Sequence, residues 1–260
     1  YETHASIVIN KDVTIVGNGS TISVESKLDG EGSVNGSKGA IEINSGADVK
    51  IEDLTVEGNK KVKHVVNVYT GEKQKTTTVE LDNVILKGAT NYGVVNNASS
   101  VTLTNVVTSG NTWGINVDNM PDASTEGATL IINKGTVINE EASVWIENAN
   151  NKKINAKITG GEFAGTVAIG DPGATLEITG GDFEGAVGTV AGSDINIVSG
   201  TFATDIRDYI DDGSEFIKDK DGNYVVMDEI DSKKPSHSYS LEEGRVERDD
   251  KEDEKNEPVV

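Results

Sequence analysis

The sequence predicts an all-β fold: a single-stranded, right-handed parallel β-helix with three strands per coil, closed by a C-terminal helical turn and a β-hairpin cap. Strand-like segments recur at intervals of about 20 to 30 residues, a period typical of solenoids whose coils bury their apolar sides on one another. Gly, Asn or Ser follows each segment, as expected of a turn. Each segment has a central apolar anchor, and the seven anchors are Ile51, Leu81, Leu103, Ile132, Ile158, Ile178 and Ile197.

Residues 1–46 are expected to form the N-terminal cap and the first coil. Residues 13–22 join a β-branched strand to a Gly-Asn-Gly turn and the start of another strand. Residues 27–40 are rich in glycine, which favours a loop.

Residues 47–204 are expected to contain the main coils. Each repeat has a second strand, such as residues 66–68 or 115–117, and a third short element after its anchor, such as residues 54–56. The last repeats are the most regular, because Phe163, Phe183 and Phe202 each follow an anchor at the same spacing. These rings are predicted to stack on one another inside the coil, although a ligand site is the alternative.

Residues 205–230 are expected to cover the open end of the coils. The segment after Thr204 resembles a helical turn with Thr204 as its N-cap. Residues 219–223 are typical of a hairpin turn, and their glycine lies too early for a calcium-binding EF-hand loop. Residues 231–260 are charged and poor in large apolar side chains, so an acidic, disordered tail or linker is expected.

Composition narrows the function classes. A formal net charge of -21 argues against binding to nucleic-acid phosphates. The absence of cysteine removes disulfides, thiolate nucleophiles and thiolate metal sites. There is no apolar run of about 18 residues, so no membrane insertion is expected. The chain starts with Tyr1, and we expect it to be part of a larger chain.

The chain resembles the pectate-lyase-like right-handed parallel β-helix superfamily over roughly residues 8–228. The resemblance is carried by the short Val/Ile/Thr strands, the opening Val-Thr-Ile-Val-Gly-Asn-Gly at 13–19, the Gly-Gly-acid-Phe segments at 160–163 and 180–183, and the segments 200–206 and 221–226. Within that superfamily it is most similar to non-catalytic adhesive domains of bacterial surface proteins. The fold hosts lyases, hydrolases and adhesins alike, so the resemblance implies architecture more than chemistry.

The resemblance implies that superfamily enzymes acting on polyuronates use an arginine near carboxylates. The arginines of this chain are Arg207, Arg245 and Arg248, so the coils have none. Lysine lacks the planar fork that matches a carboxylate. This favours a protein without catalytic residues, and no cofactor is expected.

A calcium site is the one metal hypothesis that the coil face offers. Glu52, Glu80 and Asp82 fall on outward positions of adjacent coils, and calcium prefers such oxygen ligands. The alternative is a solvated face with cross-strand pairs, Lys50 with Glu80 and Lys157 with Glu177. The histidines, His4, His64 and His237, are too scattered to suggest a metal site.

The strongest indication of ligand binding is aromatic. If Val144 and Ile146 point inward, Trp145 must point outward, on the row that contains Asn116. Trp113 and Tyr92 begin the equivalent strands of neighbouring coils, and they would extend a platform for a sugar ring. A long loop over Trp145 would instead make it a covered side chain.

These observations favour a non-enzymatic extracellular module of a bacterial cell surface, acting as a stalk or adhesin and possible binder of glycans or host and matrix components. A carbohydrate-active enzyme, a polysaccharide lyase or hydrolase, is the first alternative, since paired carboxylates hydrolyse glycosidic bonds. A segment of a phage tail fibre or spike is the second.

Overall fold

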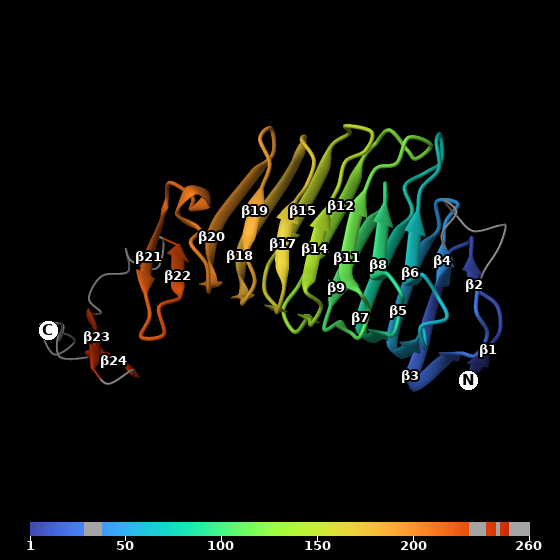
Figure 1. Ribbon diagram of the computed structural model, residues 1–260, viewed down its shortest axis with the longest axis horizontal. Coiled ribbons are helices and arrows are strands. Elements are labelled where there is room, and N and C mark those ends of the chain that lie inside the picture. The colour runs from blue at the N-terminus through green and yellow to red at the C-terminus, as the bar shows by residue number, and fades with distance from the viewer. Residues whose placement is uncertain (29–37, 229–237, 243–244, 250–260) are drawn as a thin grey trace, which may run out of the picture.

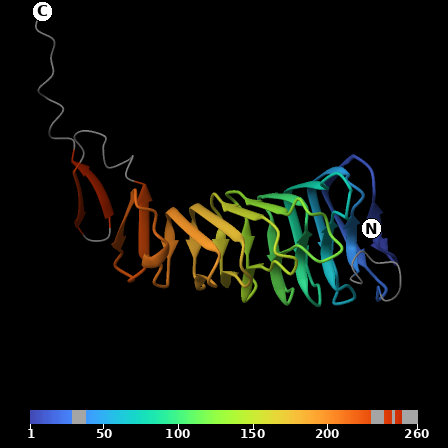
Figure 2. The same ribbon diagram turned by 90° about the horizontal axis from the view of Figure 1, so that it is seen from above.

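The computed structural model describes residues 1–28, 38–228, 238–242 and 245–249. The protein is all-β, and its strands stand side by side along the long axis of the molecule (Figure 1). Seen from above, the strands of the main body form successive layers in chain order (Figure 2). No helix in the described part of the chain has the length and apolarity needed to cross a membrane.

Two sheets form the body of the protein. We call them the large sheet, of 14 strands, and the small sheet, of eight. The large sheet contains β1 (Glu2–Thr3), β3 (Val13–Val24), β5 (Asp48–Glu57), β7 (Thr78–Lys87), β9 (Ser100–Thr104), β10 (Val107–Ser109), β12 (Ala128–Ile132), β13 (Val137–Ile138), β15 (Ile154–Ile158), β16 (Glu162–Phe163), β18 (Ala174–Phe183), β20 (Asp194–Phe202), β21 (Ser214–Lys218) and β22 (Tyr224–Asp228). The small sheet contains β2 (Ile7–Ile9), β4 (Gly39–Ile43), β6 (His64–Tyr69), β8 (Tyr92–Asn97), β11 (Trp113–Asp118), β14 (Ala142–Ile146), β17 (Thr166–Ile169) and β19 (Val187–Thr189).

The stacking of the anchors, which the sequence predicts, is confirmed. Every successive pair of anchors is in register between parallel strands of the large sheet, from Ile51 opposite Leu81 to Ile178 opposite Ile197. All seven side chains are at most 1% exposed. The β-branched and leucine side chains of one strand therefore pack on those of the next, and this apolar column forms the core.

The predicted aromatic stack is also confirmed. Phe183 lies between Phe163 and Phe202, with ring centroids 4.7 Å from each neighbour and planes 6° and 7° from parallel. The three rings are at most 2% exposed. They form one interior column at the C-terminal end of the large sheet.

The predicted coil of three strands with a helical cap is wrong. The body of the protein consists of two mainly parallel sheets, and in the described residues the third short elements form no sheet of their own. Residues 54–56, for example, continue β5 within the large sheet after a single turn at Asp53, whose φ is 53°. Asn83 and Asn105 turn the chain in the same way, because Asn and Asp tolerate a positive φ better than other side chains.

The helical part of the predicted cap is a short 3-10 helix, Arg207–Tyr209. Thr204 does not cap it: Ile206 occupies the N-cap position without a side-chain cap hydrogen bond, and the buried Thr204 hydroxyl has no hydrogen-bond partner among the described residues. Asp205 instead forms an ion pair with Arg207. The described residues include no α-helix.

The predicted hairpin is present. β21 and β22 pair in an antiparallel manner, and β22 also pairs with β20, so the hairpin covers the edge of β20, the last of the parallel strands in the large sheet. The Asp219 carboxylate accepts hydrogen bonds from the backbone N–H groups of Asp221 and Asn223, both at 2.9 Å. These bonds hold the turn that the sequence indicates.

Two of the predicted irregular regions lie partly outside the described residues. In the expected loop at 27–40, residues 29–37 are not described, and β4 begins at Gly39. In the expected tail, β23 (Ser238–Glu242) and β24 (Arg245–Asp249) form an antiparallel pair. Residues 229–237, 243–244 and 250–260 are not described.

Candidate functional site

The outer face of the small sheet has a row of aligned side chains from successive repeats. Pairing of parallel strands places Asn67, Val95, Asn116 and Trp145 in register, one on each strand from β6 to β14. Their neighbours Val66, Val94, Ile115 and Val144 are fully buried in the core. Because side chains alternate along a strand, the row faces away from the core.

A second row on this face is aromatic. His64, Tyr92 and Trp113 begin β6, β8 and β11. The His64 and Tyr92 rings are stacked with centroids 5.7 Å apart, and the Tyr92 and Trp113 centroids are 5.0 Å apart. Trp113 is 40% exposed.

Glycine explains why Trp113 points outward although it lies two residues before the inward-facing Ile115. A side chain at Gly114 would meet the core, since an added Cβ would lie 2.5 Å from both Ile138 Cγ2 and the Ser143 carbonyl oxygen. The strand therefore turns its glycine inward at this point, and its ring side chain projects to the outside.

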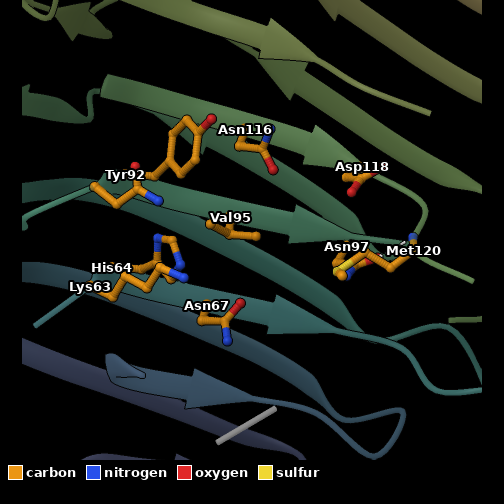
Figure 3. Close-up of a pocket in the computed structure, with 10 residues that line it drawn as sticks. Lys63, His64, Asn67, Tyr92, Val95, Asn97, Asn116, Asp118 and Met120 are labelled. Atoms are coloured by element: carbon orange, nitrogen blue, oxygen red, sulfur yellow. Dashed lines mark hydrogen bonds between the residues drawn. The ribbon is translucent and has the colours of Figure 1, made fainter. Parts of the chain in front are cut away.

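A pocket of about 140 Å³ lies between the aromatic row and the carboxyl ends of β8 and β11 (Figure 3). Ten residues from three successive repeats and one loop line it: Lys63, His64, Asn67, Asn91, Tyr92, Val95, Asn97, Asn116, Asp118 and Met120. Most of these side chains are polar but uncharged. The pocket can thus offer several hydrogen bonds together with an aromatic surface.

Two loops that are distant in sequence clasp each other beside this pocket. Gly71, after β6, pairs with Ala123, after β11. The Tyr69 hydroxyl donates a hydrogen bond of 2.8 Å to the Asp122 carbonyl oxygen, and the Ser124 N–H donates one of 2.9 Å to the Thr70 carbonyl oxygen. This clasp holds the loop from which Met120 reaches the pocket.

Acidic side chains form hydrogen bonds that hold the polar residues of the pocket in place. Asn116 Nδ2 donates a hydrogen bond of 2.9 Å to Glu147 Oε2. Asp118 Oδ1 accepts hydrogen bonds from the backbone N–H groups of Asn119 and Ala149. Burial, with the nearby charges of Glu147 and Asp118, raises the pKa of Tyr92 to about 12. The Tyr92 hydroxyl therefore keeps its proton at neutral pH and can donate a hydrogen bond.

His64 is the most unusual group in the pocket. It is 4% exposed, and its Nδ1 atom is buried with no hydrogen-bond partner in the part of the chain that the structure describes. Burial, with the charge of Lys63 beside it, lowers the pKa of His64 to about 3. The imidazole is therefore neutral at physiological pH and stacks on Tyr92 as an uncharged ring.

Acid should destabilise the protein through His64. The folded-state pKa lies below the ordinary value of 6.5, so the unfolded chain takes up the proton first, and stability present above pH 6.5 is lost as the pH falls toward 3. Between pH 7 and pH 5 we expect the free energy of unfolding to fall by about 2 kcal/mol more in the wild type than in His64→Phe. Denaturation of both proteins at the two pH values checks this, and equal pH dependence would contradict it.

The sequence-predicted binding residues are partly brought together. Tyr92 and Asn116 line the pocket, and Trp113 extends it by its contact with Tyr92. Trp145 lies next to Asn116 in the outward row but does not line the pocket. Its half-buried indole covers Gly170, where an added Cβ would lie 2.9 Å from the Trp145 ring.

Sequence reasoning missed His64 and Asp118 as members of the site, whereas Asn67 lies on the outward row that alternation predicts for Asn116 and Trp145. The sequence does contain a signal for His64. Aligning the second strands of the repeats places His64 two residues before Val66, as Tyr92 precedes Val94 and Trp113 precedes Ile115. The place of His64 in the aromatic row depends on the register of β6.

The residues of the calcium hypothesis lie on the large sheet. Glu52 is in register with Asp82, and Glu80 with Lys50. Lys50 forms an ion pair with Glu52, which raises the pKa of Lys50, and Asp82 accepts a hydrogen bond from Asn105. The described part of the chain has no group of three or more acidic, histidine or cysteine side chains placed to hold a metal ion. Of the two predicted cross-strand pairs, Lys157 with Glu177 is confirmed at 3.1 Å.

Comparison with known proteins adds no relative: no protein-family model, curated protein or solved structure matches this chain.

Proposed function

We propose that the protein is a non-enzymatic module that binds glycans through the outer face of the small sheet. The observation that carries this proposal is the aromatic row of His64, Tyr92 and Trp113 beside a pocket lined with amides. The resemblance to adhesive surface domains, noted in the sequence, is compatible with it.

The two rows match the two chemical faces of a sugar. The C–H groups of a pyranose ring form an apolar face that packs on aromatic rings, and its hydroxyls both donate and accept hydrogen bonds. Trp113 offers an exposed ring, while Asn97 and Asn116 lie within the pocket. A site of this kind recognises a sugar without altering it.

The elongated stack suits a spacer as well as a binding surface. Parallel strands pair from repeat to repeat along the body, so the module would hold its site at a distance from its attachment point. We propose an extracellular location on a bacterial surface, where glycans of a host or matrix would be the partners.

Substitution of Trp113 by Ala should abolish most glycan binding. A sugar stacked on an aromatic ring typically gains about 1 kcal/mol or more of binding free energy, so we expect an affinity loss of about tenfold. Glycan arrays followed by calorimetry on the glycans that bind would measure it. Phe216→Ala is the matched control, because Phe216 is also 40% exposed but lies on the cap hairpin.

Two results would contradict the proposal. One is a Trp113→Ala protein that binds every array glycan as the wild type does. The other is the release of new reducing ends or unsaturated products from polysaccharides by the wild type, which would favour a carbohydrate-active enzyme.

A further inference from the structure

We propose that the pocket receives one uncharged pyranose ring and that His64 Nδ1 forms a hydrogen bond with a hydroxyl of this ring. The inference rests on the proposed function and names the ligand class of the same site. Three features of the pocket support it: the buried nitrogen, the charges of the lining, and the size of the cavity.

The buried nitrogen points to a missing polar partner. Buried polar atoms in folded proteins are almost always hydrogen-bonded, because leaving one unpaired costs stability. His64 Nδ1 has no hydrogen-bond partner among the described residues, although its ring lines the pocket. A sugar hydroxyl can supply this partner whichever tautomer His64 adopts, because a hydroxyl both donates and accepts.

The lining charges favour an uncharged ligand. The two ionic side chains of the pocket, Lys63 and Asp118, have opposite signs and lie toward opposite ends of the strands (Figure 3). The ten lining residues include no arginine, so they provide no planar fork for a uronic-acid carboxylate. The neutral state of His64 removes a further cation from the site. Amide side chains from three repeats remain as the main polar partners.

The size favours a single ring. The cavity of about 140 Å³ is lined from three adjacent strands, which at about 4.8 Å apart span roughly 10 Å, a width suited to one sugar ring. Further sugars of a longer glycan would leave the pocket past Trp113, the exposed end of the aromatic row.

His64→Phe separates the hydrogen bond from the stacking. Phenylalanine keeps a flat ring against Tyr92 but has no nitrogen, so the aromatic row remains while the polar contact is lost. We expect binding of the neutral methyl glycosides of glucose, galactose, mannose and N-acetylglucosamine to weaken by about tenfold or more for whichever the wild type binds. Titration of the wild type with the same glycosides should shift the imidazole resonances of His64 in NMR spectra.

Charged probes complete the experiment. Methyl glucuronide and glucosamine should bind more weakly than the neutral glycosides and should leave the His64 resonances unchanged. The inference is overturned if His64→Phe binds neutral glycosides as the wild type does, or if a charged sugar is preferred. In both cases loss of array binding in Trp113→Ala would leave the proposed function standing, whereas absence of any glycan binding by the wild type would overturn both.

Discussion

Phe183→Ala is expected to lower the free energy of unfolding by about 3–5 kcal/mol, the usual cost of truncating a fully buried aromatic side chain. Phe183 is the middle ring of three, with the ring centroids of Phe163 and Phe202 each 4.7 Å away. Its removal therefore leaves a cavity, and one face of each neighbouring ring loses its stacking partner. Urea denaturation monitored by circular dichroism would measure the loss.

Phe216→Ala is the matched control for this experiment. Phe216 is 40% exposed on β21, so we expect a loss of less than about 1 kcal/mol. Because repeats contact mainly their neighbours, hydrogen exchange should show the effect of Phe183→Ala first in β16, β18 and β20. Equal losses in the two variants would contradict the interior stack.

Gly127→Ala should destabilise the protein by about 3 kcal/mol or more, because it combines backbone strain with a steric clash. Gly127 has a φ of +88°, and an added Cβ would lie 1.7 Å from the Lys153 carbonyl oxygen. That oxygen already accepts a hydrogen bond from Ala128 N–H, where β12 joins β15. The strand must therefore shift away from its neighbour.

Gly19→Ala introduces backbone strain without a steric clash, so it separates the two effects. Gly19 has a φ of +75° but no atom within 4 Å of an added Cβ, so only the conformational cost of about 1 kcal/mol remains. Thermal or urea unfolding of the two variants gives the comparison. If Gly19→Ala proved as damaging as Gly127→Ala, the close contact at Lys153 would not be the cause.

The order and register of the strands could be predicted because identical requirements recur. Each anchor must fill the same interior position, so the recurrence of Ile158, Ile178 and Ile197 in the sequence predicts that they are aligned in the structure. The number of sheets could not be predicted in the same way. At a single residue with positive φ, such as Asp53 or Asn83, the strand bends and its pairing resumes at the next residue, and a break in the apolar pattern does not distinguish such a bend from a new sheet.

The candidate site could be predicted only in part. An outward row follows from the alternation of a strand, which identified Trp145 and Asn116. The pocket also depends on features that alternation does not contain: the turn of Gly114 toward the core, and the clasp between Gly71 and Ala123, which are far apart in the chain. The unpaired nitrogen of His64 is a property of three-dimensional packing alone.

The division of each small-sheet strand into a core-facing and an outward-facing set has an evolutionary consequence. Val66, Val94 and Ile115 pack in the apolar core, while Asn67, Val95 and Asn116 line the pocket. Mutations in the second set change the lining of the pocket while the apolar column of the core stays the same. Duplication of a whole repeat would add another outward position at the same spacing, so new ligand preferences could arise by lengthening the array and diversifying its surface.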